Sequence, residues 1–143
     1  MSDRCKKALL KRMEGYNCAQ AVLCAFDDII GIPEETLFKL SEGFGSGMGG
    51  MKNVCGAVTG MFMAADLILG KSTPANPQSG RAAAYKRTRE LAEKFKERTG
   101  SLICADLLGE NGKRTYACND CVTDAVDILD EYIKNESGKE SKI

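Results

Sequence analysis

The sequence predicts an all-α fold, a single-domain helical bundle in which a glycine-rich loop leads into a central apolar helix. Apolar residues recur at intervals of three and four along most of the chain, whereas no segment alternates with a period of two. Glycine, asparagine and proline interrupt this pattern where helices end or begin. At 143 residues the chain can bury its own core without disulfides, and it contains no repeat of fixed period. We therefore expect one helical domain over residues 1–143.

Three helices are expected in the first part of the chain. The spacing of the apolar residues predicts them over 3–13, 18–30 and 33–43, each ending at or near a glycine. Asn17 suits the N-cap of the second helix, because its side chain can accept a hydrogen bond from an unpaired N–H of the first turn. Pro33 suits the first turn of the third helix, where its missing N–H costs nothing.

The glycine loop, which we define as residues 43–54, precedes the most apolar segment of the sequence. That segment, residues 55–69, is expected to form the central helix, and its small residues let neighbouring backbones come close. Residues 71–80 hold two prolines and several small polar residues, so we expect a mobile connection there.

Three more helices are expected in the second part of the chain. Residues 81–98 alternate charged helix formers with apolar residues, which is typical of an exposed amphipathic helix. Ser101 can cap a short helix that ends at residue 108. The last helix should run from about 116–118 to about 133, and we expect residues 137–143 to form a frayed tail.

Charge and hydropathy exclude several classes of partner. Twenty basic residues balance twenty acidic ones, which gives no reason to expect nucleic acid or an anionic membrane. Basic residues interrupt the N-terminal segment, and no stretch has the length of a membrane span, so we expect a cytoplasmic protein without a membrane partner. In that compartment the seven cysteines should be free, catalytic or metal-bound rather than paired as structural disulfides.

Histidine is absent, and this limits the chemistry more than any other feature of the composition. Its absence removes Ser/His/Asp and Cys/His nucleophiles, zincin and Cys₂His₂ zinc motifs, and Rieske ligation. Tryptophan is absent too, so aromatic platforms for bases or sugars are scarce. Any chemistry must rest on sulfur, carboxylate, lysine or tyrosine.

Four cysteines lie at or near predicted helix starts: Cys18, Cys55, Cys104 and Cys118. A helix N-terminus favours the thiolate, which is the nucleophile and the metal ligand. One such cysteine alone would more often be a small buried thiol, but four in the same kind of position favour a shared role. We therefore expect a helical scaffold that gathers thiolates, either for metal or cluster binding or for dithiol redox chemistry.

The remaining cysteines have different expectations. Cys121 forms a CxxC pair with Cys118, which can close a redox disulfide or supply two metal ligands, although Cys121 could also face the core. Cys24 lies about 240° round the helix from Cys18, so the two cannot easily share a site. Cys5 falls on a helix expected to be peripheral. We interpret Cys5 and Cys24 as structural.

The glycine loop is a second candidate element of the site. Its letters satisfy GxGxxG, but a helical rather than a strand pattern precedes them, so the dinucleotide fingerprint fails. Residues without a Cβ let backbone amides approach sulfur or an anion closely, whereas the alternative is a flexible linker. The glycines expected at a bound cofactor are Gly45, Gly47, Gly49, Gly50 and Gly56.

These motifs together resemble the "putative redox-active protein" family, which is named for its C…GCAxxG…C…C cysteines. The resemblance covers about residues 5–133, and in this chain Val54 stands where the family name has a glycine before the cysteine. It implies a bacterial or archaeal helical protein with four characteristic cysteines, and Cys121 is an addition to that pattern. The matching segments are GYNCAQAV at 15–22, the loop at 43–49, CGAVTG at 55–60, Cys104, and Cys118 with Val122, Asp124 and Ala125.

With this resemblance, we consider three hypotheses about function. A similar module in split-Soret cytochromes is credited with an iron–sulfur cluster, so the first is an electron-transfer protein whose Cys18, Cys55, Cys104 and Cys118 bind a [2Fe–2S]-type centre and serve a redox partner protein. The second is a thiol–disulfide oxidoreductase that uses Cys118 with Cys121 or with Cys55. The third is a structural zinc site or a plain helical interaction module. The apolar central helix also allows a homodimer.

Overall fold

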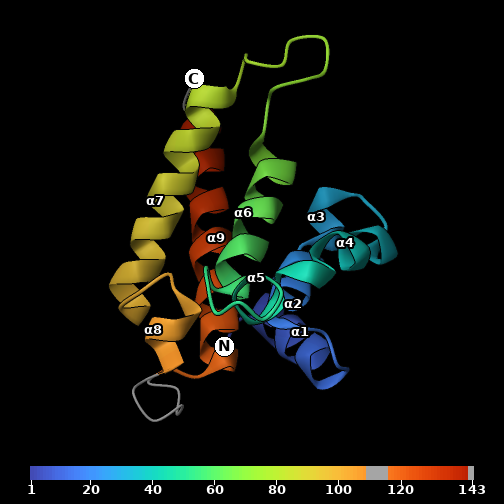
Figure 1. Ribbon diagram of the computed structural model, residues 1–143. Helices are drawn as coiled ribbons and strands as arrows, with labels where there is room; N and C mark the ends of the chain where they lie inside the picture. Colours follow the sequence, from blue (N-terminus) through green and yellow to red (C-terminus); the bar gives the residue numbers. More distant parts are fainter. Residues whose placement is uncertain (109–115, 142–143) are drawn as a thin grey trace.

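The computed structural model describes residues 1–108 and 116–141. The predicted all-α class is confirmed, because these residues form helices joined by turns and no strand (Figure 1). The elements are α1 Asp3–Met13, α2 Cys18–Cys24, α3 Asp27–Ile30, α4 Glu34–Ser41, the 3₁₀ turn η1 Glu42–Phe44, α5 Gly45–Met48, α6 Gly56–Leu69, α7 Arg81–Thr99, α8 Cys104–Leu108 and α9 Cys118–Ser141.

The apolar helix α6 lies at the centre of the bundle, as its composition predicts. It packs against α2 on one side and against α9 and α7 on the other (Figure 1). The core between these helices includes the fully buried Phe26, Leu23, Met61, Leu91 and Phe95. None of the helices described is long and apolar enough to cross a bilayer.

The crossing of α2 and α6 depends on two glycines. A Cβ on Gly60 would lie 2.7 Å from the carbonyl oxygen of Ala19, and a Cβ on Gly56 would lie 2.4 Å from the Sγ of Cys18. Real Cβ atoms do not approach other atoms so closely, so only glycine permits this contact. The two helix starts are therefore held side by side.

Two helix bounds differ from the prediction. The helix expected over 18–30 is divided into α2 and α3 at Ala25 and Phe26, where the chain turns and the Phe26 ring becomes fully buried. Beyond this turn Asp27 and Asp28 form ion pairs with Lys7 and Arg4 of α1. The last helix continues to Ser141 instead of ending near residue 133.

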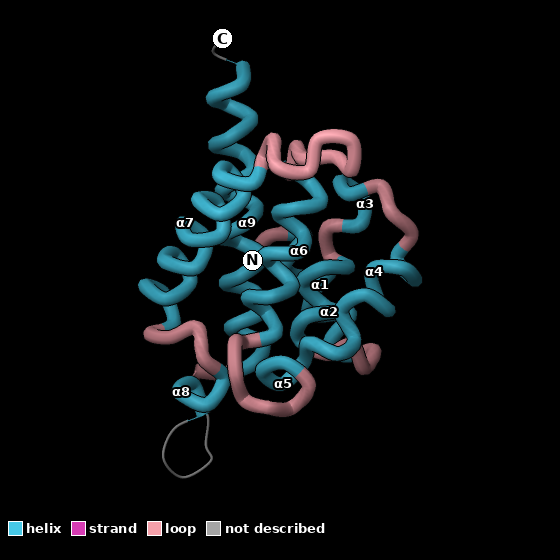
Figure 2. The backbone as a smooth tube through the Cα atoms, turned by 45° about the horizontal axis from the view of Figure 1, so that its top comes forward, coloured by secondary structure: helices cyan, strands magenta, loops and turns pink. Residues whose placement is uncertain are grey.

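The connection over residues 71–80 lies at the opposite end of α6 from α5 and α8 (Figure 2). It is built of turns, in which Thr73 and Asn76 exchange two backbone hydrogen bonds of 2.9 and 3.3 Å. Its mobility stays a prediction. The glycine loop and the cysteine-bearing helix starts are gathered at the other end.

Candidate cysteine pocket

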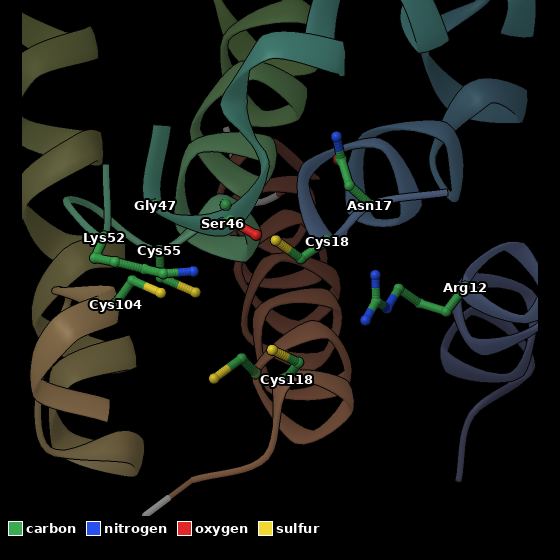
Figure 3. Close-up of a pocket in the computed structure, with 11 residues that line it drawn as sticks. Arg12, Asn17, Cys18, Ser46, Gly47, Lys52, Cys55, Cys104 and Cys118 are labelled. Atoms are coloured by element: carbon green, nitrogen blue, oxygen red, sulfur yellow. The ribbon is translucent and has the colours of Figure 1, made fainter. Parts of the chain in front are cut away.

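Five cysteines line one cavity of about 170 Å³ at this end of the bundle (Figure 3). They include all four that the sequence singles out, together with Cys121. Cys18, Cys55 and Cys104 are nearly buried, and Cys118 is partly exposed. The described residues that line the cavity are Arg12, Asn17, Cys18, Ser46, Gly47, Lys52, Cys55, Gly56, Cys104, Cys118 and Cys121.

The predicted placement of these cysteines at helix starts is confirmed. Cys18, Cys104 and Cys118 are the first residues of α2, α8 and α9, and Cys55 is the N-cap of α6. Asn17 closes a capping box on α2: its side chain accepts from Gln20 N–H, and the Gln20 side chain accepts from Asn17 N–H, both at 2.9 Å. The positive ends of the long helices α6 and α9 therefore face the same cavity.

Cys55 and Cys104 are brought together by a short antiparallel backbone pairing. The N–H of Cys55 donates to the carbonyl of Leu102, and the N–H of Cys104 donates to the carbonyl of Asn53, both at 2.7 Å. Val54 and Ile103 form the bridge between these two bonds. Figure 3 shows the two sulfurs on the same wall of the cavity.

Cys121 is fully buried and its thiol hydrogen-bonds with that of Cys55. This bond raises the pKa of Cys55 far above its ordinary value, and burial raises it further. The amides of Ala57 and Val58 act in the opposite direction but have a smaller effect. The helix start therefore does not give Cys55 the lowered pKa that its position predicts.

Only part of the glycine set lies at the cavity. Gly47 and Gly56 line it, and Gly45 packs against Asn17, where a Cβ would lie 2.7 Å from the side chain. Gly49 and Gly50 are not among the lining residues, and both donate their N–H groups back to the carbonyl of Gly45. The amides that reach the Cys55 sulfur come from the first turn of α6 instead.

The glycine loop contains a left-handed turn. The element α5 has left-handed backbone angles at Ser46 and Gly47, and the same region of φ continues through Met48, Gly49 and Gly50. Closing bonds run from Lys52 N–H to Ser46 O at 3.2 Å and from Asn53 N–H to Gly47 O at 2.9 Å. Alternating glycines in the sequence indicate a loop, but they do not predict this handedness.

Two cations and no carboxylate are found among the described residues that line the cavity. The Arg12 guanidinium reaches it from α1 and donates to the Asn119 side chain at 3.2 Å and to the Tyr16 carbonyl at 3.0 Å. Lys52 reaches it from the glycine loop. Sequence reasoning did not single out Arg12, Lys52 or Ser46, and for Lys52 the available signal was its position three residues before Cys55.

Cys5 and Cys24 lie outside the cavity, as expected for structural cysteines. Both are fully buried. The Cys5 thiol donates to Asp127 at 3.0 Å, and burial is the main reason that the pKa of each thiol is raised to about 11. Neither is placed to share a ligand with the five cavity cysteines.

The sulfurs line the wall of the cavity and do not converge on one point. Within residues 1–108 and 116–141 no three or more cysteine, aspartate or glutamate side chains are arranged to hold a metal ion. The donor set itself, sulfur with amide hydrogens and cations around it, suits thiolate-bound iron.

One comparison with known proteins finds a family that is named for its cysteine pattern. A family model described as "Putative redox-active protein (C_GCAxxG_C_C)" matches residues 16–132. A protein of Archaeoglobus fulgidus described as "Uncharacterized protein" is 27% identical over 133 residues, which cover 86% of this chain and 88% of the relative. No solved structure matches the chain.

Proposed function

The chain belongs to the putative redox-active protein family with the C_GCAxxG_C_C pattern, and on that premise we propose that it is an electron-transfer protein whose cysteine pocket holds an iron–sulfur cluster. The observation that carries the proposal is that five cysteines line a single cavity. Four of them lie at four separate helix starts, and the fifth, Cys121, lies in the first turn of α9. The ligands we propose are Cys18, Cys55, Cys104 and Cys118.

The arrangement supports a binuclear cluster better than a single ion. In a [2Fe–2S] centre four cysteines are shared between two irons, so no three cysteine sulfurs need to meet on one metal. Cys55 and Cys104 share one wall of the cavity and would suit one iron. Structural zinc is the alternative, and it would need its sulfurs round one tetrahedral point.

The surroundings of the sulfurs suit a negatively charged centre. Arg12 and Lys52 contribute positive charge, and α6 and α9 contribute the positive ends of their dipoles. When bound, the cluster would supply a one-electron carrier. The chain would bind the cluster through sulfur and donate amide hydrogens from Ala57 and Val58 to the Cys55 sulfur. Three of the four ligands are buried and would be shielded from water. Cys118 is partly exposed, so its side of the pocket would lie nearest to a redox partner.

Anaerobic reconstitution with iron and sulfide tests this proposal. It should give a coloured protein with visible charge-transfer absorption, and the colour should survive replacement of the remote Cys5 by serine. A colourless protein without iron after anaerobic handling would contradict it.

A second candidate is favoured by one specific contact. The hydrogen-bonded thiols of Cys55 and Cys121 could close a disulfide, releasing two protons and passing two electrons to a disulfide substrate, which would be reduced to two thiols. The sequence had suggested Cys118 with Cys121 or with Cys55, whereas this contact names Cys55 and Cys121. It ranks second because the raised pKa of Cys55 slows thiolate attack at neutral pH.

Peptide mapping distinguishes the two. Oxidation of the metal-free protein with oxidised glutathione should link Cys55 to Cys121 if the dithiol reading is right. A link between Cys118 and Cys121, or none, would contradict it.

A further inference from the structure

The backbone of Lys52 has a left-handed conformation, which residues other than glycine rarely adopt. Its φ is +59°, and Ser46 and Met48 share this property at +51° and +67°. Glycine occupies the left-handed positions between Ser46 and Lys52 at 47, 49 and 50. Lys52 is therefore one of three residues in this loop that adopt the left-handed conformation without being glycine.

The strain at Lys52 cannot relax locally. Its N–H donates to Ser46 O at 3.2 Å, and its carbonyl accepts from Ala105 N–H at 3.0 Å. The loop also packs tightly against it, since a Cβ on Gly47 would lie 2.6 Å from Lys52 Cα. The direction in which the side chain leaves the backbone is therefore determined by the loop and by the start of α8.

That direction is toward the sulfurs. Figure 3 shows the Lys52 amine beside the side chains of Cys55 and Cys104. Unlike Arg12, which donates to Asn119 and Tyr16, Lys52 makes no side-chain hydrogen bond or ion pair with any residue in the described ranges. No described carboxylate lines the cavity to neutralise this ammonium.

We propose that Lys52 is the charge-compensating residue of the cysteine pocket: the left-handed backbone holds its ammonium over the sulfurs, where it stabilises the more negative state of the centre. For a bound cluster, which rests on the proposed function, that state is the reduced one, so Lys52 raises the reduction potential. For the metal-free protein, the same charge attracts small anions to the cavity. Lys52 acts through the sulfurs and is a positioning and tuning residue.

The metal-free protein provides a test that does not depend on a cluster. Iodoacetate is an anion and iodoacetamide is neutral, and the same thiolate attacks the iodomethylene carbon of either reagent and displaces iodide. The ratio of the two alkylation rates therefore reports local charge and not the thiolate fraction. Lys52→Gln should lower the iodoacetate-to-iodoacetamide rate ratio at the cavity cysteines several-fold. In 1 M salt, which screens the ammonium charge, the wild-type ratio should fall toward that of the variant but not below it. Lys52→Arg should keep the ratio, and Lys39→Gln on α4 is the remote control.

The reconstituted protein provides the second readout. Lys52→Gln should shift the reduction potential to a more negative value, and Lys52→Arg should leave it close to that of the wild type. An unchanged alkylation ratio in Lys52→Gln overturns the inference whether or not a cluster binds. A shifted ratio in a chain that never takes up iron would instead overturn the proposed function and leave the role of Lys52 standing.

Thermal unfolding tests the strain. Lys52→Gly and Lys52→Gln both lack the ammonium, but only glycine relieves the left-handed backbone. The glycine variant should therefore unfold at a higher temperature than the glutamine variant. A lower midpoint for Lys52→Gly would show that position 52 is not strained and would overturn the argument that its direction is imposed.

Discussion

The Sγ atom of Cys18 packs directly on the Cα of Gly56, where a Cβ would lie only 2.4 Å from the sulfur. The same Cβ would also lie 2.9 Å from the carbonyl oxygen of Phe44. One residue without a side chain therefore lets the Cys18 thiol of α2, the start of α6 and the beginning of the glycine loop meet at one wall of the cavity. The glycine of the cysteine motif has a direct structural role in placing a sulfur.

Replacing Gly56 by alanine should displace the Cys18 sulfur. We expect a loss of about 1–3 kcal/mol in the free energy of unfolding, because the added methyl group overpacks the contact, together with the loss of most of the bound iron. Denaturant unfolding and iron analysis measure the two effects. Gly43→Ala is the matched control, since a Cβ there meets no atom within 4 Å. Full iron binding in Gly56→Ala would contradict this role.

Gly60 offers a test in which two effects have opposite sign. At an interior position of a helix, alanine is more stabilising than glycine by about 0.5–1 kcal/mol. At position 60, however, the alanine Cβ would lie 2.7 Å from the Ala19 carbonyl oxygen. We expect the clash to prevail, so Gly60→Ala should lower the free energy of unfolding by about 1–3 kcal/mol. An increase in stability would mean that α2 and α6 can move apart at little cost.

Asn17 should matter both for stability and for the pocket. Its side chain caps α2 at 2.9 Å and also donates to the Glu42 carbonyl at 2.9 Å. Asn17→Ala should cost about 1–2 kcal/mol, and Asn17→Asp should retain the cap but lose the bond to Glu42. Chemical denaturation of the three proteins measures the difference. Equal stability of the alanine and wild-type proteins would show that the cap contributes nothing.

The Arg4–Asp28 pair predicts a dependence on pH. The Arg4 guanidinium lies 2.6 Å from Asp28 and lowers the pKa of that carboxyl to about 2. Because the folded pKa is below the unfolded value of about 3.9, the pair stabilises the fold above pH 4, and this contribution is lost as the pH falls toward 2.

Asp28→Asn tests the sign of this effect. Asp28 is more than half exposed, so we expect a loss of no more than about 1 kcal/mol at pH 7. The variant and the wild type should have nearly the same stability at pH 2. A difference that grows on acidification would contradict the assignment.

The sequence predicted the helical class, the central helix and the cysteines at helix starts, because these depend on local periodicity and capping. It did not predict what depends on contacts distant in the chain. The pairing of Cys55 with Cys104 needs a bridge between Val54 and Ile103, and the turn at Phe26 follows from burial of its ring in the core. The charge of Lys52 reaches the sulfurs only through a left-handed backbone that its residue type disfavours.

The most direct test of the central claim is iron and acid-labile sulfide analysis of the anaerobically reconstituted protein. We expect about two irons and two sulfides per chain, as a [2Fe–2S] centre requires. Both should be lost in Cys18→Ser, Cys55→Ser, Cys104→Ser and Cys118→Ser, and both should be kept in Cys5→Ser, because Cys5 lies outside the cavity. Absence of iron from the wild type, or equal iron in all five variants, would contradict the account.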